Sequence, residues 1–246
     1  MVVSEVKSMT NTNQKVAIVT GGTGTLGTAI CQFLLAGEYQ LAIPYIFEHE
    51  ITPFQSAVGN QIGSVSLIRT NITQVEDVNQ LITQTLDQFG QIDVLANIAG
   101  GFLGGIPTSD LDLEKWDLMM DLNLKSVFLC CKAVLPHMIQ RQSGKIVNVS
   151  ARAGLNGIAG LSAYSTSKAG VRILTESIAE EVKNDGVNVN AIMPSIIDTP
   201  PNRQAMPNED HSLWVDPHEI AKVTGFLISD TAKIINGAAI PVYGRA

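Results

Sequence analysis

The sequence predicts an α/β fold, a single domain built on a doubly wound parallel sheet of seven strands. Short apolar runs alternate with segments of helical spacing along the chain, which is the order that parallel strands joined by helical crossovers produce. Most of these runs are continuous rather than alternating, as in strands that are covered on both faces. The 246 residues show no linker and no repeat, so one large domain is expected.

The first expected strand is the apolar run KVAIVT at 15–20. A segment of helical spacing follows at 25–37 and ends at a glycine, a typical helix stop. Two further runs, at 39–46 and 64–69, predict the second and third strands. No element is predicted between these two strands.

The middle of the chain continues the alternation. An amphipathic helix is expected at 74–90 and a fourth strand at 92–100. The segment 113–141 is strongly apolar and predicts a long helix that is broken near its start. The run GKIVNVS at 144–150 predicts the fifth strand.

The last part of the chain predicts a helix at 162–185, a sixth strand at 187–193, a helix at 217–229 and a seventh strand at 238–243. In a doubly wound sheet, the ligand lies at the carboxyl ends of the strands. The functional residues are therefore sought just after each strand.

Composition limits the partners. The net charge is −7 and the basic residues form no run, which argues against nucleic acid or an anionic membrane as a partner. Residues 1–14 are polar and are expected to form a flexible tail before the domain at 15–246. The three cysteines and four histidines lack the spacing of a disulfide framework or a metal site. We expect no metal, no membrane span and a cytoplasmic location.

A glycine-rich segment, TGGTGTLG at 20–27, lies between the first strand and the first helix. Gly22, Gly24 and Gly27 match the G-x-G-x-x-G pattern of dinucleotide-binding Rossmann folds. Glycines let the backbone approach a pyrophosphate, and a helix N-terminus offers free N–H groups with a partial positive charge. The expected cofactor is NAD(H) or NADP(H).

The second strand lacks the acid that often follows it and binds the ribose hydroxyls. The equivalent position is Tyr45 or the adjacent Ile46, neither acidic nor basic, while Glu48 and Glu50 lie further along the chain. The sequence therefore leaves the choice between NAD and NADP open.

Tyr164 and Lys168 are four residues apart in a predicted helix, so their side chains share one face. A nearby ammonium and an oxidised nicotinamide would both stabilise a phenolate, so the pKa of Tyr164 is expected to be lowered. Tyr164 is then suited to exchange a proton with a substrate.

In this order, these segments resemble the short-chain dehydrogenase/reductase family over about 15–246. The markers are TGGTGTLG at 20–27, NIAG at 97–100, Asn123, the pair Tyr164 and Lys168, and PSIIDTP at 194–200. Together they imply an NAD(P)(H)-dependent oxidoreductase with a Rossmann domain.

Two departures from the common family pattern, Thr25 in place of glycine and Ala151 in place of a catalytic serine, look like the dihydropteridine reductase branch. The segments AGGFLGG at 99–105 and DTPPNRQAMPNEDHSLW at 198–214 are also similar to that branch. Two residues depart from the branch: the branch tends to lack the asparagine found here as Asn123, and it has an acid in place of Tyr45.

The resemblance implies roles for individual residues. The catalytic residues would be Tyr164, Lys168 and Asn123, with Asn123 kinking its helix and holding a water that relays protons to Lys168. Substrate contacts are expected from Ala151, Arg152, Phe102 and Trp214. The expected cofactor-binding residues are Gly21, Thr23, Thr25, Leu26, Gly27, Tyr45, Asn71, Ile72, Asn97, Ala99, Gly100, Tyr164, Lys168, Pro194, Ile197 and Thr199.

Ala151 removes a hydrogen-bond donor to the reacting oxygen, a loss that can cost ~10²–10³-fold in rate. Three explanations stay open. The substrate is an electron-poor conjugated ring such as a quinonoid pterin; another donor, Arg152 or Ser162, replaces the serine; or the chain has kept nucleotide binding without catalysis.

The sequence therefore predicts hydride transfer to a small carbonyl or planar conjugated substrate, with a catalytically silent nucleotide-binding regulator as the alternative. The retention of Asn123, Tyr164 and Lys168 together favours the enzyme. The apolar residues of the helix within 113–141 cover more than one face, and a helix apolar on several faces needs a partner or full burial. A homodimer or homotetramer is therefore expected.

Overall fold

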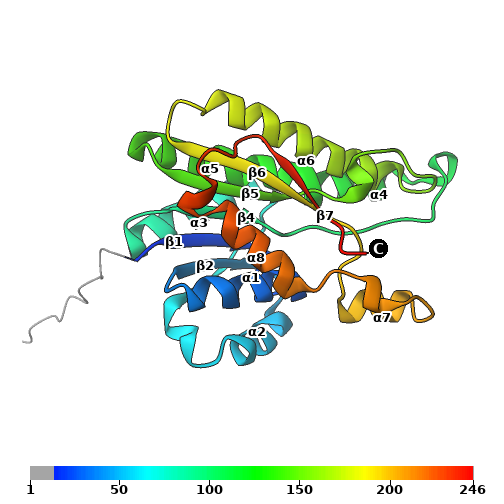
Figure 1. Cartoon of the computed structure of the whole chain (residues 1–246), viewed down its shortest axis with the longest axis horizontal. Helices are drawn as coiled ribbons and strands as arrows, with labels where there is room; N and C mark the ends of the chain where they lie inside the picture. The colour runs from blue at the N-terminus through cyan, green and yellow to red at the C-terminus, as the bar shows by residue number, and fades with distance from the viewer. Residues whose placement is uncertain (1–13, 246) are drawn as a thin grey trace, which may run out of the picture.

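A computed structural model describes residues 14–245, which form an α/β domain with a seven-stranded, all-parallel sheet (Figure 1). The strand order is β3-β2-β1-β4-β5-β6-β7, as the sequence predicts for a doubly wound sheet. The strands are β1 (Val16–Thr20), β2 (Gln40–Tyr45), β3 (Val65–Arg69), β4 (Val94–Asn97), β5 (Gly144–Val149), β6 (Val187–Pro194) and β7 (Ala239–Val242).

Helices cover both faces of the sheet (Figure 1). They are α1 (Thr25–Ala36), α2 (Ile51–Val58), α3 (Val75–Phe89), α4 (Leu113–Met120), α5 (Ser126–Arg141), α6 (Ser162–Glu181), α7 (Pro200–Ala205) and α8 (Pro217–Leu227). Successive residues of β1 point to opposite faces. Accordingly, Val19 packs in the core with α1, α2 and α8, while Ile18 packs in the core with α3, α5 and α6.

The strand order reverses between β1 and β4. Chain segments leave the sheet in opposite directions at this point, which opens a crevice at the carboxyl ends of the strands. Thr20, the last residue of β1, helps to shape the crevice because its Oγ1 accepts hydrogen bonds from the N–H groups of Ile98 and Ala99.

The structure contains two helices that the sequence did not predict, α2 and α7. Helix α2 was not expected between the second and third strands; it buries only Phe54 and Val58, too few apolar positions to show a helical period. The break expected in the helix at 113–141 is confirmed, since a π-helical segment, Asp121–Lys125, joins α4 to α5.

The tail expected at 1–14 lies outside the described residues except for Gln14. The side-chain oxygen of Gln14 accepts a hydrogen bond of 2.7 Å from Gln40 at the start of β2.

Candidate active site

Two adjoining cavities lie in the crevice at the strand ends. The first, of about 520 Å³, is lined by the glycine loop and by the residues that follow β2, β3 and β4. The second, of about 250 Å³, is lined by residues that follow β4, β5 and β6 together with Tyr164 and Lys168 of α6. Leu26, Ile98 and Gly100 line both cavities, so an elongated ligand could occupy the two at once.

The glycine loop is folded against its own helix. Gly21 has a φ of +64°, and a Cβ there would lie 2.8 Å from the Cα of Ala99. A Cβ on Gly27 would lie 2.0 Å from the carbonyl oxygen of Gly21. No side chain caps the N-terminus of α1 at Gly24, which leaves its first N–H groups directed at the cavity, the geometry of an anion site.

Most of the expected cofactor-binding residues line the first cavity. They are Gly21, Thr23, Thr25, Leu26, Gly27, Tyr45, Asn71, Ile72, Ala99, Gly100 and Thr199. Lys168, Tyr164, Pro194 and Ile197 instead line the second cavity. The glycine cradle and the free helix N-terminus in one cavity, with a buried ammonium in the next, fit a dinucleotide that extends across both.

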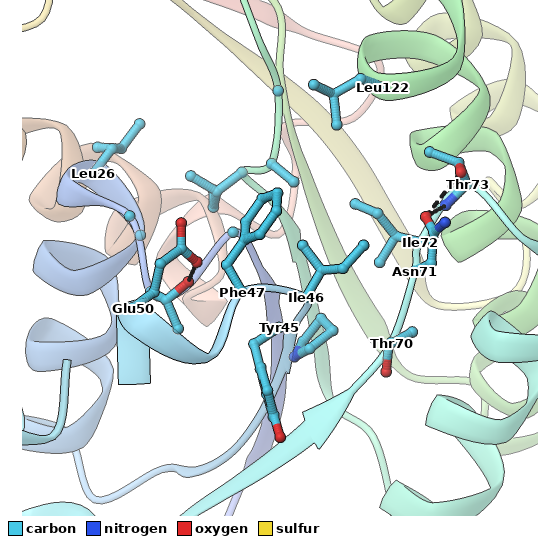
Figure 2. Close-up of a pocket in the computed structure, with 18 of the residues that line it drawn as sticks. Leu26, Tyr45, Ile46, Phe47, Glu50, Thr70, Asn71, Ile72, Thr73 and Leu122 are labelled. Atoms are coloured by element: carbon cyan, nitrogen blue, oxygen red, sulfur yellow. Dashed lines mark hydrogen bonds between the residues drawn. The ribbon is translucent and has the colours of Figure 1, made fainter. Parts of the chain in front are cut away.

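Two residues in the first cavity behave differently from what the sequence predicts. The Tyr45 hydroxyl lies 3.5 Å from Glu48 Oε1 and points away from the other labelled side chains in Figure 2. Asn71 Oδ1 accepts hydrogen bonds from both the N–H and the hydroxyl of Thr73. The side-chain carbonyl of Asn71, an expected cofactor-binding residue, is therefore already engaged in a local turn.

Asn97 does not reach either cavity. Its side chain is buried and donates a hydrogen bond of 2.9 Å to Asn148 Oδ1, while Asn148 donates in turn to Thr175 on α6. Asn97 was expected to bind the cofactor, but its side chain does not line the cavities. Asn97 is the last residue of β4, and its side chain points to the face of the sheet that α5 and α6 cover.

Lys168 is held deep in the second cavity. Its side chain is almost fully buried, and Nζ donates a hydrogen bond of 2.9 Å to the carbonyl oxygen of Val149. Burial lowers the pKa of this ammonium to about 8. Ser150 ties β5 to the same turn of α6, because its hydroxyl donates to the carbonyl oxygen of Lys168.

Tyr164 lies on the same face of α6, as its spacing from Lys168 predicts. The ring of Phe102 contacts it edge-on, with ring centroids 4.9 Å apart. In the protein alone, burial raises the pKa of Tyr164 to about 12, opposite to the lowering expected from Lys168. The cause of the rise is desolvation of the phenolate.

Asn123 is fully buried in the π-helical segment and fixes the loop after β4. Its amide donates to the carbonyl oxygen of Gly101 and to the hydroxyl of Ser167, and its Oδ1 accepts from the N–H of Gly101. A Cβ on Gly100 would lie 2.8 Å from Asn123 Oδ1 and 3.1 Å from Lys168 Nζ. Asn123 thus positions the loop beside Lys168, and the water relay stays a prediction.

The four expected substrate residues divide into two groups. Ala151 and Phe102 line the second cavity, whereas Arg152 and Trp214 line neither. The Arg152 guanidinium lies 5.3 Å from the centroid of the Tyr243 ring, and Trp214 is buried against His211.

The sequence did not point to three residues that line the cavities. Ser195 and Asn202 line the second cavity and Phe47 lines the first. Ser195 and Asn202 lie within segments that resemble the family, but neither was given a role. Phe47 and Ser195 follow β2 and β6 in irregular segments and Asn202 lies in α7, so only the fold brings their side chains to the cavities. Glu50, expected further out, also lines the first cavity.

Comparison with known proteins places the chain in a family. Residues 15–210 match the family model described as short chain dehydrogenase, and the chain belongs to this family. It is an NAD(P)-dependent oxidoreductase of the short-chain type, and its cofactor is NAD(H) or NADP(H).

Individual relatives match nearly the whole chain. A 3-oxoacyl-(acyl-carrier-protein) reductase from a Synechocystis species is 35% identical over 96% of this chain and 98% of its own. A 2-(R)-hydroxypropyl-CoM dehydrogenase from Xanthobacter autotrophicus is 34% identical over 94% and 97%, respectively. The solved structure of ElxO with NADP bound superposes with a TM-score of 0.89 at 26% identity, over 94% of this chain and 98% of ElxO.

Membrane-spanning helices and metal-binding clusters were sought in residues 14–245, the part of the chain that the structure describes. Within them, no helix has the length and apolar character needed to cross a bilayer. The same residues hold no cluster of three or more His, Cys, Asp or Glu side chains arranged to bind a metal ion.

The buried ammonium makes stability depend on pH. Because the folded pKa of Lys168 lies near 8, below its ordinary value of 10.5, the unfolded chain binds more protons between these values. The free energy of unfolding should therefore rise with pH across this interval. In Lys168→Met this contribution is absent, and the variant should be at least as stable as wild type near pH 7 although inactive. Urea unfolding of both proteins from pH 7 to 10 measures the difference, and equal slopes would contradict the burial effect.

Proposed function

We propose that this oxidoreductase interconverts a small carbonyl compound and its alcohol. The observation that carries the proposal is the second cavity, where the Tyr164 hydroxyl and the Lys168 ammonium line the space next to the glycine loop. When bound, the nicotinamide supplies or accepts the hydride. The two relatives described above have names that refer to reduction of an oxo group and oxidation of a hydroxyl group, which supports this substrate class.

The residues of the chain handle the proton. In the reductive direction, the carbonyl carbon gains a hydride and the carbonyl oxygen gains the Tyr164 proton, so the product is a neutral alcohol. The Lys168 ammonium lies on the same helix face and is suited to bind the nicotinamide ribose and to attract the phenolate that remains. Its contact with the Val149 carbonyl oxygen uses one of its three N–H groups.

A planar conjugated substrate, of the kind that a dihydropteridine reductase uses, is a second candidate. Ala151 favours it, because the cavity wall has a methyl group where the carbonyl reaction would use a hydroxyl. The exposed ring of Phe102 beside Tyr164 could also stack on a flat molecule. The relatives found by comparison are not named for such a substrate, so we rank it second. The silent regulator is not favoured, since the second cavity retains the reactive pair.

The substitute donors expected from the sequence do not fit the cavity. Neither Arg152 nor Ser162 lines it. Ser195 does, although its hydroxyl donates to the carbonyl oxygen of Tyr243. Asn202 donates one N–H to the carbonyl oxygen of Ile197, which leaves its second N–H as a donor candidate.

Ala151→Ser distinguishes the two substrate classes. The new hydroxyl should raise kcat/KM for simple ketones by ~10-fold or more, because it donates to an oxygen that gains negative charge. Reduction of a quinonoid ring should stay unchanged, since little charge builds on one oxygen. Steady-state rates with a ketone and with a quinonoid pterin measure both effects. Ala151→Cys serves as control, because cysteine is similar in size to serine but is a weak hydrogen-bond donor. If kcat/KM for ketones does not rise, the site does not lack a hydrogen-bond donor, and Asn202 becomes the candidate for that donor.

We also propose that the protein is a homodimer or homotetramer in the cytoplasm. Leu118 on α4 and Phe128 on α5 are 55% and 44% exposed, and Ile173 on α6 is 49% exposed. Contact between copies through these helices would cover the apolar side chains.

Light scattering at micromolar concentration should give the mass of two or four chains, and Phe128→Asp should lower it. A wild-type mass of one chain would contradict the proposal. Cell fractionation tests the location.

A further inference from the structure

Glu50 brings a carboxylate to the wall of the first cavity. It ends the short helical turn Glu48–Glu50 that follows β2. Its Oε2 accepts a hydrogen bond of 2.6 Å from the Thr23 hydroxyl of the glycine loop, drawn as a dashed line in Figure 2. Both residues are half-buried and line the cavity. The carboxylate is therefore held at one position beside the start of α1.

The charge at this wall is negative. Of the residues that line the first cavity, all of them within the described part of the chain, Glu50 is the one with a charged side chain. NADP differs from NAD by a phosphate on the 2′-oxygen of the adenosine ribose, and sites for NADP usually hold that phosphate with arginine. This cavity wall offers a carboxylate in place of a cation.

The position of Glu50 is close to where the adenosine ribose must lie. A pyrophosphate at the N-terminus of α1 and an adenine beside Asn71 and Ile72 would leave the ribose between them, next to Thr23. In Figure 2, Glu50 lies on the other side of Phe47 and Ile46 from Asn71. Acids that bind ribose hydroxyls occur about 20 residues beyond the glycine motif, and Glu50 follows Gly27 by 23 residues.

We propose that Glu50, held by Thr23, selects NAD(H) over NADP(H). Its carboxylate accepts hydrogen bonds from the ribose hydroxyls of NAD(H) and repels the 2′-phosphate of NADP(H). It thereby supplies the acid that Tyr45 does not. This assignment sets the chain apart from ElxO, whose solved structure has NADP bound.

The test measures nucleotide binding without substrate, so its result does not depend on the substrate class proposed above. NADH and NADPH are titrated into wild type and Glu50→Gln, and binding is followed by nucleotide fluorescence. Glutamine keeps an oxygen that accepts from Thr23 and removes only the charge. Wild type should bind NADH at least ~100-fold more tightly than NADPH, since like charges at an interface are strongly disfavoured. Glu50→Gln should reduce this ratio at least ~10-fold, mainly through tighter NADPH binding.

Glu48→Gln is the matched control. It removes the same charge from the same turn, but Glu48 is exposed and is not among the residues that line the cavity. Its NADH-to-NADPH ratio should equal that of wild type. Equal affinity of wild type for both nucleotides would overturn the proposal. An unchanged NADH-to-NADPH ratio in Glu50→Gln would also overturn it. Equal changes of this ratio in Glu50→Gln and Glu48→Gln would overturn it too, because they would show that net charge, and not the position of Glu50, determines the preference. Circular dichroism verifies that each variant is folded.

Discussion

Tyr164→Phe is expected to lower kcat by ~10²–10⁴-fold, the usual contribution of a positioned proton donor. The phenyl ring retains the packing against Phe102, whose ring centroid lies 4.9 Å from that of Tyr164, so the cavity should keep its shape. NADH affinity should therefore stay close to that of wild type. Stopped-flow measurement of hydride transfer, together with NADH titration, separates loss of chemistry from loss of binding.

Tyr39→Phe provides a control for removal of a phenolic hydroxyl elsewhere. Tyr39 packs against the core near α1 and does not line either cavity, so its variant should turn over at the wild-type rate. Near-normal kcat in Tyr164→Phe would show that another group donates the proton. A large loss of NADH affinity would instead assign Tyr164 a binding role.

Gly27→Ala is expected to have the second large effect. The added methyl group would lie 2.0 Å from the carbonyl oxygen of Gly21 and 2.7 Å from the Cα of Gly22. Backbone atoms cannot move aside as a side chain can, so the loop must open. Overpacking of this kind typically costs ~1–3 kcal/mol of stability, occasionally more. Urea unfolding should show this loss, and nucleotide titration should show that binding is weakened or abolished.

Gly24→Ala is the matched control within the same loop. Its φ is −76°, and its added Cβ would lie 3.4 Å from the nearest atom, again the Gly21 carbonyl oxygen. The variant should unfold at nearly the wild-type urea concentration. Comparable destabilisation by both alanines would mean that the loop tolerates no side chain anywhere, and that the contact between Gly27 and Gly21 has no special importance.

The sheet could be predicted because its strands are short, continuous apolar runs whose period needs no tertiary information. All seven strands lie within one or two residues of the predicted ranges except β4, which ends at Asn97 rather than residue 100. The segment 98–101 after it is not a strand and forms the loop held by Asn123. Helix α2 was missed because only two of its residues face the core. Local patterns thus identify elements that bury a full face.

The site was predicted less evenly. Tyr164 and Lys168 were found because their spacing on one helix makes them neighbours wherever the helix packs. Asn97 was misplaced because a strand residue can face either side of the sheet, and its motif does not say which. Glu50 was underestimated because its contact with Thr23 joins segments 27 residues apart, and only the folded loop brings these side chains together. Contacts of this kind need the three-dimensional structure.

The close approach of the chain at Gly21, Gly27 and Gly100 has a consequence for protein engineering. At each position the space for a Cβ is taken by another part of the site: Ala99, the Gly21 carbonyl group, or the Asn123 and Lys168 side chains. These positions are closed to substitution in a directed-evolution library, whatever nucleotide is selected for. Productive diversity must come from residues that line the first cavity without supporting its backbone, such as Tyr45 and Phe47. A library confined to such positions could retune nucleotide choice while leaving the scaffold intact.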